Sequence, residues 1–266
     1  MQATRNIMLT LLPKIHSLLE KNAYTVRHGL VKGLKMKGGL QFVWQILPPS
    51  KEEIFLLGLD LAGQTVYDIG GFEGILTMFF CRAVGDKGRV ITFEPNPVNF
   101  RKMLENIKLN HLTNVVTLQT ALGRKKGKVA LVFHPSEPAQ GSIRKSVNKQ
   151  ILKKKGSETI HLQIDSLDNQ IISKSLPKPD LVKIDVEGLE EDVLRGMNET
   201  IKHHEPKLYL EIHGVSKEEK SKNAHQIVIF LLEHGYSIYH VESNRIVTLS
   251  NAHSAIEGHL YAYTAK

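Results

Sequence analysis

Three glycines follow an acidic residue at the end of an apolar segment, in the run V-Y-D-I-G-G-F-E-G over residues 66–74. Gly70, Gly71 and Gly74 leave no side chain between the backbone and a bound ligand. The apolar run over residues 75–81 predicts a helix whose N-terminal amides face that ligand. A glycine turn alone also fits an ordinary tight turn, so the interpretation depends on a second feature downstream.

That second feature is a carboxylate twenty positions after Gly74. Residues 89–93 form another apolar strand pattern, and Glu94 follows it directly. A carboxylate at the tip of the second strand can accept hydrogen bonds from both hydroxyls of a ribose. The glycine turn and Glu94 together predict a Rossmann-type adenosine site.

The details of the turn favour one cofactor over another. The dinucleotide fingerprint is G-x-G-x-x-G, whereas this chain has D-x-G-x-F-x-G, with Phe72 where a pyrophosphate needs close backbone approach. Asp68, at the tip of the first strand, suits a cationic partner. The amino-acid end of S-adenosylmethionine carries an ammonium group beside its sulfonium. The sequence therefore predicts a methyl donor and not NAD.

Three segments in this order and spacing resemble the FkbM family of S-adenosylmethionine-dependent methyltransferases. They are residues 66–74, F-E-P-N-P at residues 93–97, and L-V-K-I-D-V-E-G at residues 181–188. The resemblance is best over residues 56–213, and G-G-L at residues 38–40 is similar to the lead-in of many members.

The resemblance implies a class I methyltransferase fold, which is α/β and Rossmann-like, with a seven-stranded, mostly parallel sheet and helices on both faces. It also implies methylation of a hydroxyl on a sugar, glycan or natural product, without naming the acceptor. Thr120 and Ala121 occupy the tip of the third predicted strand, where class I methyltransferases line the adenine edge. The residues expected to hold the cofactor are Asp68, Gly70, Gly71, Phe72, Gly74, Glu94, Pro95, Asn96, Thr120, Ala121 and Asp185.

Four polar residues are expected to meet at the carboxyl edge of the sheet, where α/β enzymes keep their chemistry. Asp185 and Glu187 follow the fourth predicted strand, over residues 181–184. Glu211 ends the fifth, over residues 207–211, and His213 follows it. His213 is the better base near neutral pH, with a reference pKa of about 6.5, and Asp185 could orient the acceptor, bind the methionine ammonium or take the proton late. The alternatives are turn capping by Asp185 and Glu187 and a structural role for His213.

Length and composition predict one sizeable α/β domain. Of the 266 residues, 41% are hydrophobic, which suffices for a core over residues 56–266 with an N-terminal helical and basic extension over residues 1–55. Residues 7–20 have helical periodicity and are expected to form a cap. Alternating patterns at residues 128–133 and 159–164 predict an added β-hairpin arm.

Asn96 and Pro97 predict the start of a helix over residues 98–109. Residues 236–241 and 259–263 are expected to close the sheet as antiparallel strands, with residues 246–249 between them as part of the hairpin.

Charge suggests where an acceptor enters. The net charge is +8, and two segments, residues 21–51 and 141–156, contain basic but no acidic side chains. The second has no aromatic residue on which a base could stack, and we expect it to be a loop that serves as a solvated lid or contacts an anionic acceptor. A nucleic-acid methyltransferase is disfavoured, because the strand-four proline-aromatic motif of amino-methylation is missing.

Two further classes stay open. Convergent carboxylates are compatible with a divalent-metal methyltransferase, which chelator sensitivity would reveal, and a non-catalytic cofactor-binding module would bind without turnover. No metal ligand is assigned, since His203, His204 and Glu205 lie at a helix end. The lone Cys81 and the lack of a long apolar run or cleavage pattern predict a soluble, cytoplasmic protein in which Cys81 is a small hydrophobe.

Overall fold

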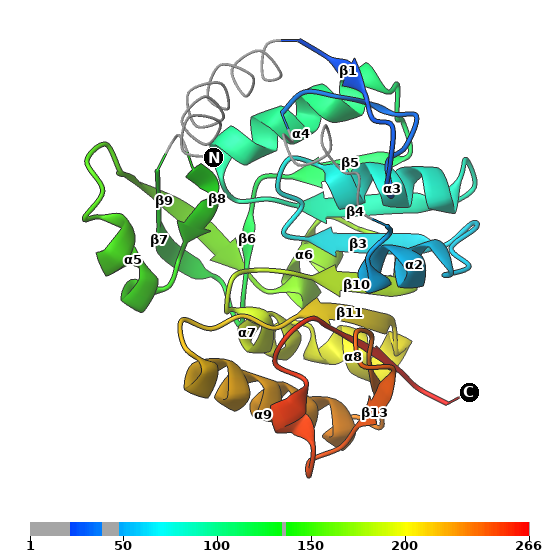
Figure 1. Cartoon of the computed structure of the whole chain (residues 1–266), viewed down its shortest axis with the longest axis vertical. Helices are drawn as coiled ribbons and strands as arrows, with labels where there is room; N and C mark the ends of the chain where they lie inside the picture. Colours follow the sequence, from blue (N-terminus) through cyan, green and yellow to red (C-terminus); the bar gives the residue numbers. More distant parts are fainter. Residues whose placement is uncertain (1–21, 39–47, 135–136, 266) are drawn as a thin grey trace, which may run out of the picture.

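The computed structural model describes residues 22–38, 48–134 and 137–265 (Figure 1). The cap expected over residues 7–20 lies outside the described residues. Within these ranges no helix is long and apolar enough to cross a membrane.

The main sheet has eight strands in the order β13-β12-β14-β11-β10-β3-β4-β5. The five strands from β11 to β5 are parallel, and β14, β12 and β13 extend the sheet with antiparallel pairing. The predicted class I α/β fold is confirmed, with one strand more than the seven expected, because the short β13 pairs with β12 at the edge. The bounds are β3 Thr65–Ile69, β4 Arg89–Phe93, β5 Val115–Leu118, β10 Leu181–Ile184, β11 Lys207–Glu211, β12 Ser237–His240, β13 Arg245–Val247 and β14 His259–Tyr263.

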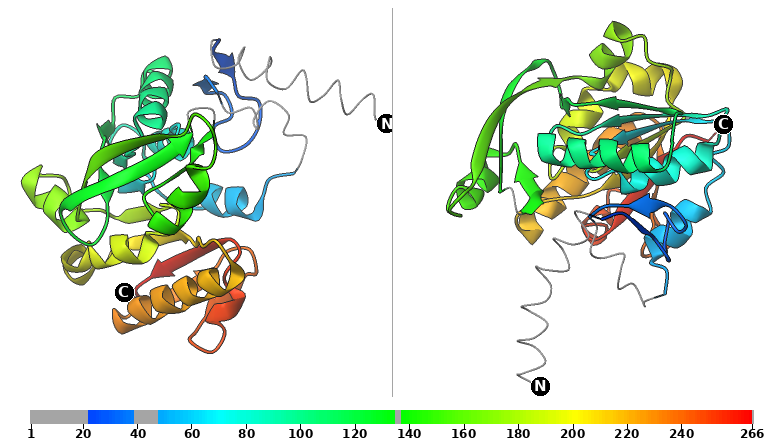
Figure 2. Two further views of the ribbon diagram at one scale, coloured as in Figure 1. Left: turned by 90° about the vertical axis from the view of Figure 1, so that its left-hand side faces the viewer. Right: turned by 90° about the horizontal axis from the view of Figure 1, so that it is seen from above.

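Helices cover both faces of this sheet (Figure 2). Alternate residues of the strands face opposite sides, so Val66 and Val90 pack in one core while Tyr67 and Ile91 pack in the other. The first core includes α2 (Lys51–Leu57), α3 (Ile75–Val84) and α4 (Pro97–Leu109). The second includes α6 (Leu167–Ser173), α7 (Glu190–Arg195), α8 (Asn198–His204) and α9 (Lys217–Glu233), with the short 3-10 helix Ala252–Ser254.

Helix α2 connects the N-terminal part of the chain to the sheet. Ser50 and Glu53 form a capping box at its start, and Phe55 stacks on Tyr209 at a centroid distance of 5.9 Å. The two-stranded sheet of β1 (Tyr24–Thr25) and β2 (Lys35–Met36) lies beside α4. The predicted boundary between the N-terminal extension and the domain, between residues 55 and 56, thus falls inside α2, which packs on the sheet.

The added arm is a four-stranded sheet in the order β6-β9-β7-β8. Its β7 (Gly127–His134) and β9 (Glu158–Asp165) pair antiparallel, as the sequence predicts, and β6 (Ala121–Leu122) and β8 (Glu137–Ser142) complete it. The expectation of a plain loop over residues 141–156 is wrong: α5 (Lys145–Ile151) lies there. Val147 and Ile151 form an apolar stripe that the surrounding lysines obscure in the sequence, and Ile151 is buried.

The turn after β3 lies directly against the chain leaving β10. Gly70 has a φ of +84°, and a Cβ atom added to it would lie 1.8 Å from the carbonyl oxygen of Asp185. The amide of Asp185 also donates to the carbonyl of Ile69 at 3.1 Å. Glycine is therefore required here both by backbone conformation and by close approach.

We expect Gly70→Ala to lower the free energy of unfolding by more than about 4 kcal/mol, because strain and a backbone clash add together. Gly63→Ala is the matched control: Gly63 also has a positive φ, +74°, but nothing lies within 4 Å of an added Cβ. The control should lose only about 1 to 2 kcal/mol. Urea unfolding of both variants measures the difference, and equal losses would contradict the close approach.

Candidate active site

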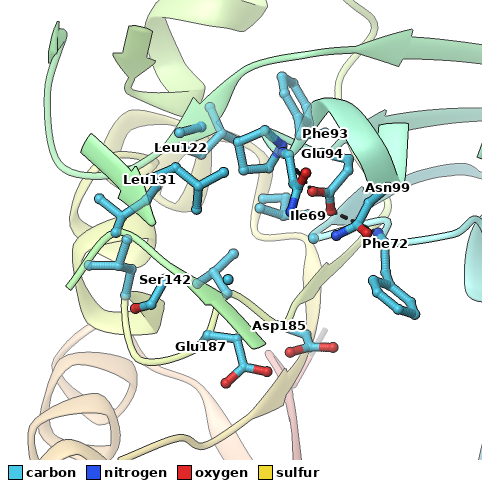
Figure 3. Close-up of a pocket in the computed structure, with 18 of the residues that line it drawn as sticks. Ile69, Phe72, Phe93, Glu94, Asn99, Leu122, Leu131, Ser142, Asp185 and Glu187 are labelled. Atoms are coloured by element: carbon cyan, nitrogen blue, oxygen red, sulfur yellow. Dashed lines mark hydrogen bonds between the residues drawn. The ribbon is translucent and has the colours of Figure 1, made fainter. Parts of the chain in front are cut away.

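A cavity of about 240 Å³ opens at the carboxyl ends of β3 and β4, beside the arm (Figure 3). We call it the adenosine cavity. Of the residues predicted to bind the cofactor, it is lined by Gly70, Phe72, Glu94, Pro95, Asn96, Thr120, Ala121 and Asp185. In Figure 3, Glu94 lies at one end of the cavity and Asp185 and Glu187 at the other.

Backbone amides fix the carboxylate of Glu94. Its Oε2 accepts a hydrogen bond from the amide of Phe72 at 2.9 Å, and its Oε1 accepts one from the amide of Asn96 at 2.8 Å. Burial raises the pKa of Glu94 to about 7, although these hydrogen bonds act in the opposite direction. A buried carboxylate held this way keeps free lone pairs toward the cavity, as a ribose site requires.

A second hollow of about 410 Å³ adjoins the first, and we call it the α2 hollow. Gly70, Phe72 and Asp185 line both, so the two meet at these residues. The other residues of the α2 hollow are Leu30, Ser50, Glu52, Glu53, Gly71, Ile75, Leu76 and Lys183. Asp185 therefore lies on the wall that the two hollows share.

A buried ammonium group joins the strands beneath this junction. Lys183, 3% exposed, places its Nζ 3.2 Å from Oδ1 of Asp68 and 3.5 Å from Oδ2 of Asp185. The same Nζ donates to the carbonyl of Gly70 at 2.7 Å. Burial alone would lower the pKa of Lys183, but the charges of Asp68 and Asp185 outweigh it and raise the pKa, so the group stays protonated.

The structure gives Asp68 a different partner from the one expected. Its side chain is fully buried, lines neither hollow, and accepts a hydrogen bond from the hydroxyl of Thr77 at 2.6 Å. The cation beside it is the Lys183 ammonium and not a ligand. Asp68 therefore acts on the site indirectly, through its ion pair with Lys183.

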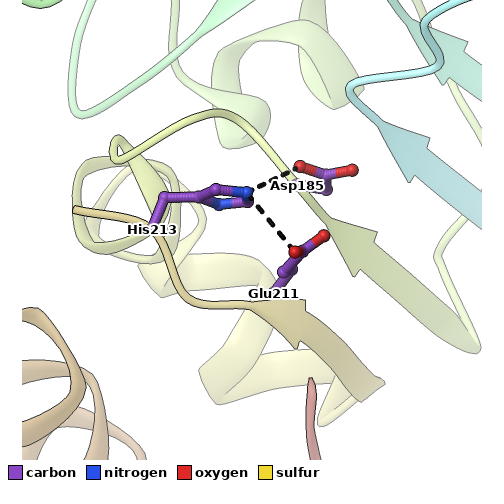
Figure 4. Close-up of side chains that lie close together, drawn as sticks. All are labelled: Asp185, Glu211 and His213. Carbon is purple, nitrogen blue, oxygen red and sulfur yellow. Dashed lines mark ion pairs between the residues drawn. The ribbon is translucent and has the colours of Figure 1, made fainter. Parts of the chain in front are cut away.

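The four predicted catalytic residues do come together. Nε2 of His213 lies 3.7 Å from Oδ1 of Asp185, 3.6 Å from Oε1 of Glu211 and 3.9 Å from Oε2 of Glu187. Figure 4 shows that His213 points between Asp185 and Glu211. The predicted convergence is thus present, while the roles of these residues stay predictions.

A fourth carboxylate, that of Glu190, contacts the other ring nitrogen of His213. Nδ1 of His213 lies 3.0 Å from Oε1 of Glu190, which is 1% exposed and also accepts from the amide of Gly188. Burial lowers the pKa of His213, but Glu190, Glu187 and Asp185 outweigh burial and raise it to about 9. The expectation of a histidine that titrates near pH 6.5 is therefore wrong for this environment.

The remaining residues predicted to bind the cofactor have structural roles. Gly71 lines the α2 hollow, but a Cβ there would lie 2.3 Å from Oγ1 of Thr92, so packing requires the glycine. Gly74 lines neither hollow and caps α3 with a φ of +91° against Met103. The side chain of Asn96 accepts from the amide of Val98 at 3.0 Å, which confirms the predicted helix start.

Other residues of the site went unrecognised in the sequence. Glu190 reads as one acid among several at a helix start, and Lys183 reads as a single polar residue in an apolar strand; that interruption was the available signal for Lys183. The arm adds a third group, Leu131, Ser142 and Ile143, which line the adenosine cavity. Nothing local in the sequence brings them to this cavity.

His203 and Cys81 lie away from the group around Asp185. His203 lies 3.5 Å from Glu199 on the exposed surface of α8. Among the described residues, Asp185, Glu211 and His213 are the group whose ligand atoms lie close enough together to hold a metal ion. Cys81 is buried, as expected of a small hydrophobe, and burial raises the pKa of its thiol to about 12.

Comparison with known families agrees with this geometry. The model of the FkbM methyltransferase domain matches residues 68–238, well over half of the chain. The chain therefore belongs to the FkbM methyltransferase family. The predicted family and, at the level of the family, the predicted cofactor S-adenosylmethionine are confirmed.

Individual relatives match only part of the chain and at low sequence identity. The chain is 30% identical over 146 residues to "Methyltransferase 1" of Beauveria bassiana, covering 50% of this chain and 58% of that protein. It is 36% identical over 115 residues to the hexuronic acid methyltransferase AglP of Haloferax volcanii, covering 43% of this chain and 44% of that protein. The chain thus spans about half the length of these curated relatives.

Among solved structures, the methyltransferase FkbM of Methylobacillus flagellatus KT superposes with a TM-score of 0.50 at 17% identity. The match covers 77% of this chain and 45% of that one. At this identity the likeness supports the fold alone.

If Glu94 binds the ribose as predicted, its raised pKa should make cofactor affinity depend on pH. Below about pH 7 the buried carboxyl is protonated, and above it the ionised group accepts stronger hydrogen bonds. Calorimetry should show S-adenosylhomocysteine binding about tenfold tighter at pH 8 than at pH 6. Glu94→Gln should bind more weakly with a flatter profile; the same slope in both proteins would contradict the assignment.

The contribution of the Lys183 ammonium to stability can be tested by removing it. Lys183→Met leaves Asp68 buried without its cation, and we expect a loss of about 3 to 5 kcal/mol in unfolding free energy. Asp68→Asn added to Lys183→Met should restore part of that loss.

The control is Lys220→Met, which breaks an ion pair of the same 3.2 Å length with the exposed Glu257. It should cost no more than about 1 kcal/mol. Similar losses in unfolding free energy for Lys183→Met and Lys220→Met would show that the buried ion pair stabilises the fold no more than an exposed one.

Proposed function

We propose that this chain transfers a methyl group from S-adenosylmethionine to a hydroxyl oxygen of a sugar, glycan or related small molecule. The observation that carries the proposal is the group of Asp185, Glu187, Glu211 and His213, in which Asp185 lines both the adenosine cavity and the α2 hollow and Glu187 lines the adenosine cavity. Polar groups gathered where the reacting end of the cofactor must lie are typical of a site that aligns an acceptor.

The lining residues support a binding mode in which the cofactor reaches from Glu94 to the α2 hollow. Glu94 is placed to accept from the ribose hydroxyls, and Thr120 and Ala121 border the space left for adenine. Glu52 and Glu53 line the α2 hollow, where their charges suit the ammonium of the methionine end. When bound, the cofactor supplies an electrophilic methyl group on sulfur, and it would lie close to Asp185.

The acceptor side follows from Asp185 and its neighbours. Asp185 is fixed by Lys183 on one oxygen and faces His213 with the other, so it can hold an acceptor hydroxyl in line. Such alignment contributes roughly 7 to 11 kcal/mol in favourable cases. Burial and then the neighbouring carboxylates raise the pKa of Glu187, although His213 opposes them, which makes Glu187 a stronger base for the hydroxyl proton.

A sugar acid suits the charge of this chain. The net charge is +8, and the turn after α5 exposes Lys153, Lys154 and Lys155. One relative is named for hexuronic acid methylation. We therefore place uronic acid glycosides first among the acceptors to be tried, with neutral glycosides beside them.

The test is methyl transfer from labelled S-adenosylmethionine to this acceptor panel. With an active acceptor, Asp185→Asn should lower the single-turnover rate at least tenfold, because the hydroxyl loses its alignment, while S-adenosylhomocysteine still binds. Glu199→Gln, on the exposed surface of α8, is the control and should keep the wild-type rate. Transfer by Asp185→Asn at the wild-type rate would remove Asp185 from the chemistry.

A further inference from the structure

The group formed by Asp185, Glu211 and His213 has the composition and spacing of a divalent-cation site. One ligand atom from each residue lies within 4.8 Å of the others. We propose that these three side chains bind a divalent metal ion of the Mn²⁺ type, and that the ion holds the acceptor hydroxyl. The role of the ion rests on the proposed function, whereas its binding does not.

The two separations from His213 to the carboxylates are compatible with an ion between them. Nε2 of His213 lies 3.7 Å from Asp185 and 3.6 Å from Glu211, beyond ordinary hydrogen-bond length. Two ligand atoms that each lie about 2.1 Å from one ion, at angles from 90° to 180°, are about 3.0 to 4.2 Å apart. Both measured separations fall inside that range.

The surroundings orient each ligand atom toward the same point. Nδ1 of His213 lies against the buried Glu190, an arrangement that holds the ring and directs Nε2 at the group, as in carboxylate–histidine–metal sites. Binding of the ion would release the proton of Nε2 to solvent. Asp185 gives one oxygen to Lys183 and the other to this group. Glu211 likewise turns Oε2 toward His259, at 3.7 Å, and Oε1 toward His213.

An independent observation lies beside the group. The hydroxyl of Tyr209, which is 1% exposed, makes no hydrogen bond of ordinary geometry among the described residues, and the side chain of Glu52 is the polar group beside it. Tyr209 lines a void of about 20 Å³ together with Asp185 and Glu211. A void of this size holds one water molecule, and a hydrated ion at the group would carry a water that satisfies Tyr209.

The ligand set indicates the kind of ion. Carboxylates suit Mg²⁺, Ca²⁺ and Mn²⁺, and imidazole suits the transition metals, so one histidine with two carboxylates favours Mn²⁺. Three protein ligands leave open positions for water and for acceptor oxygens. An acceptor hydroxyl bound there loses its proton more readily, and Glu187, 3.9 Å from His213, is placed to receive it.

The test is a titration of the whole chain with Mn²⁺ in the absence of cofactor and acceptor, followed by the electron paramagnetic resonance signal of free Mn²⁺. The expected result is one site per chain. Glu211→Gln and His213→Gln should each weaken binding at least tenfold, and Glu190→Gln should weaken it about tenfold through the histidine. Circular dichroism and urea unfolding verify that each variant is folded.

The control is His203→Gln, which removes an exposed histidine that also lies beside a carboxylate. It should leave Mn²⁺ affinity unchanged. Absence of binding, or binding that survives Glu211→Gln and His213→Gln, would overturn the site. Full methyl transfer by chelator-treated protein would overturn the role of the ion and leave the proposed function intact. Tight Mn²⁺ binding without transfer to any hydroxyl would support the metal site but overturn the proposed function and, with it, the role of the ion.

Discussion

The Lys183 ammonium is the interaction on which the rest of the site depends. One charge inside the sheet contacts Asp68 on β3, the carbonyl of the glycine turn and Asp185 at the end of β10. A buried charge is tolerated only when its partners surround it, so the three elements must stay together. The close approach of Gly70 to Asp185 is the backbone side of the same constraint.

The geometry of the adenosine cavity and of the α2 hollow follows from these contacts of Lys183. The glycine turn separates the adenosine cavity from the α2 hollow, and Phe72 at the turn donates its amide to Glu94. Asp185, fixed from below, presents its second oxygen to His213. Cofactor recognition and acceptor chemistry thus share one rigid support, which is what alignment-based catalysis requires.

The sequence predicted the elements with strong local signals. Periodicity and turn residues place β4, β10, β11 and β14 at the bounds seen in the structure, because buried parallel strands form short apolar runs. Helix α5 was missed, since its apolar stripe is short and surrounded by lysines. The partnership of Lys183 with Asp68, and of Glu190 with His213, joins residues far apart in the chain, and no local pattern encodes such contacts.

A crystal structure with S-adenosylhomocysteine tests the central claim most directly, namely that one ligand crosses from the adenosine cavity to the α2 hollow past Asp185. The account predicts that both ribose hydroxyls lie within hydrogen-bond distance of Glu94, that adenine lies beside Ala121, and that the sulfur lies next to Asp185. A ligand whose adenosine occupies the α2 hollow, or whose sulfur lies away from Asp185, would contradict it.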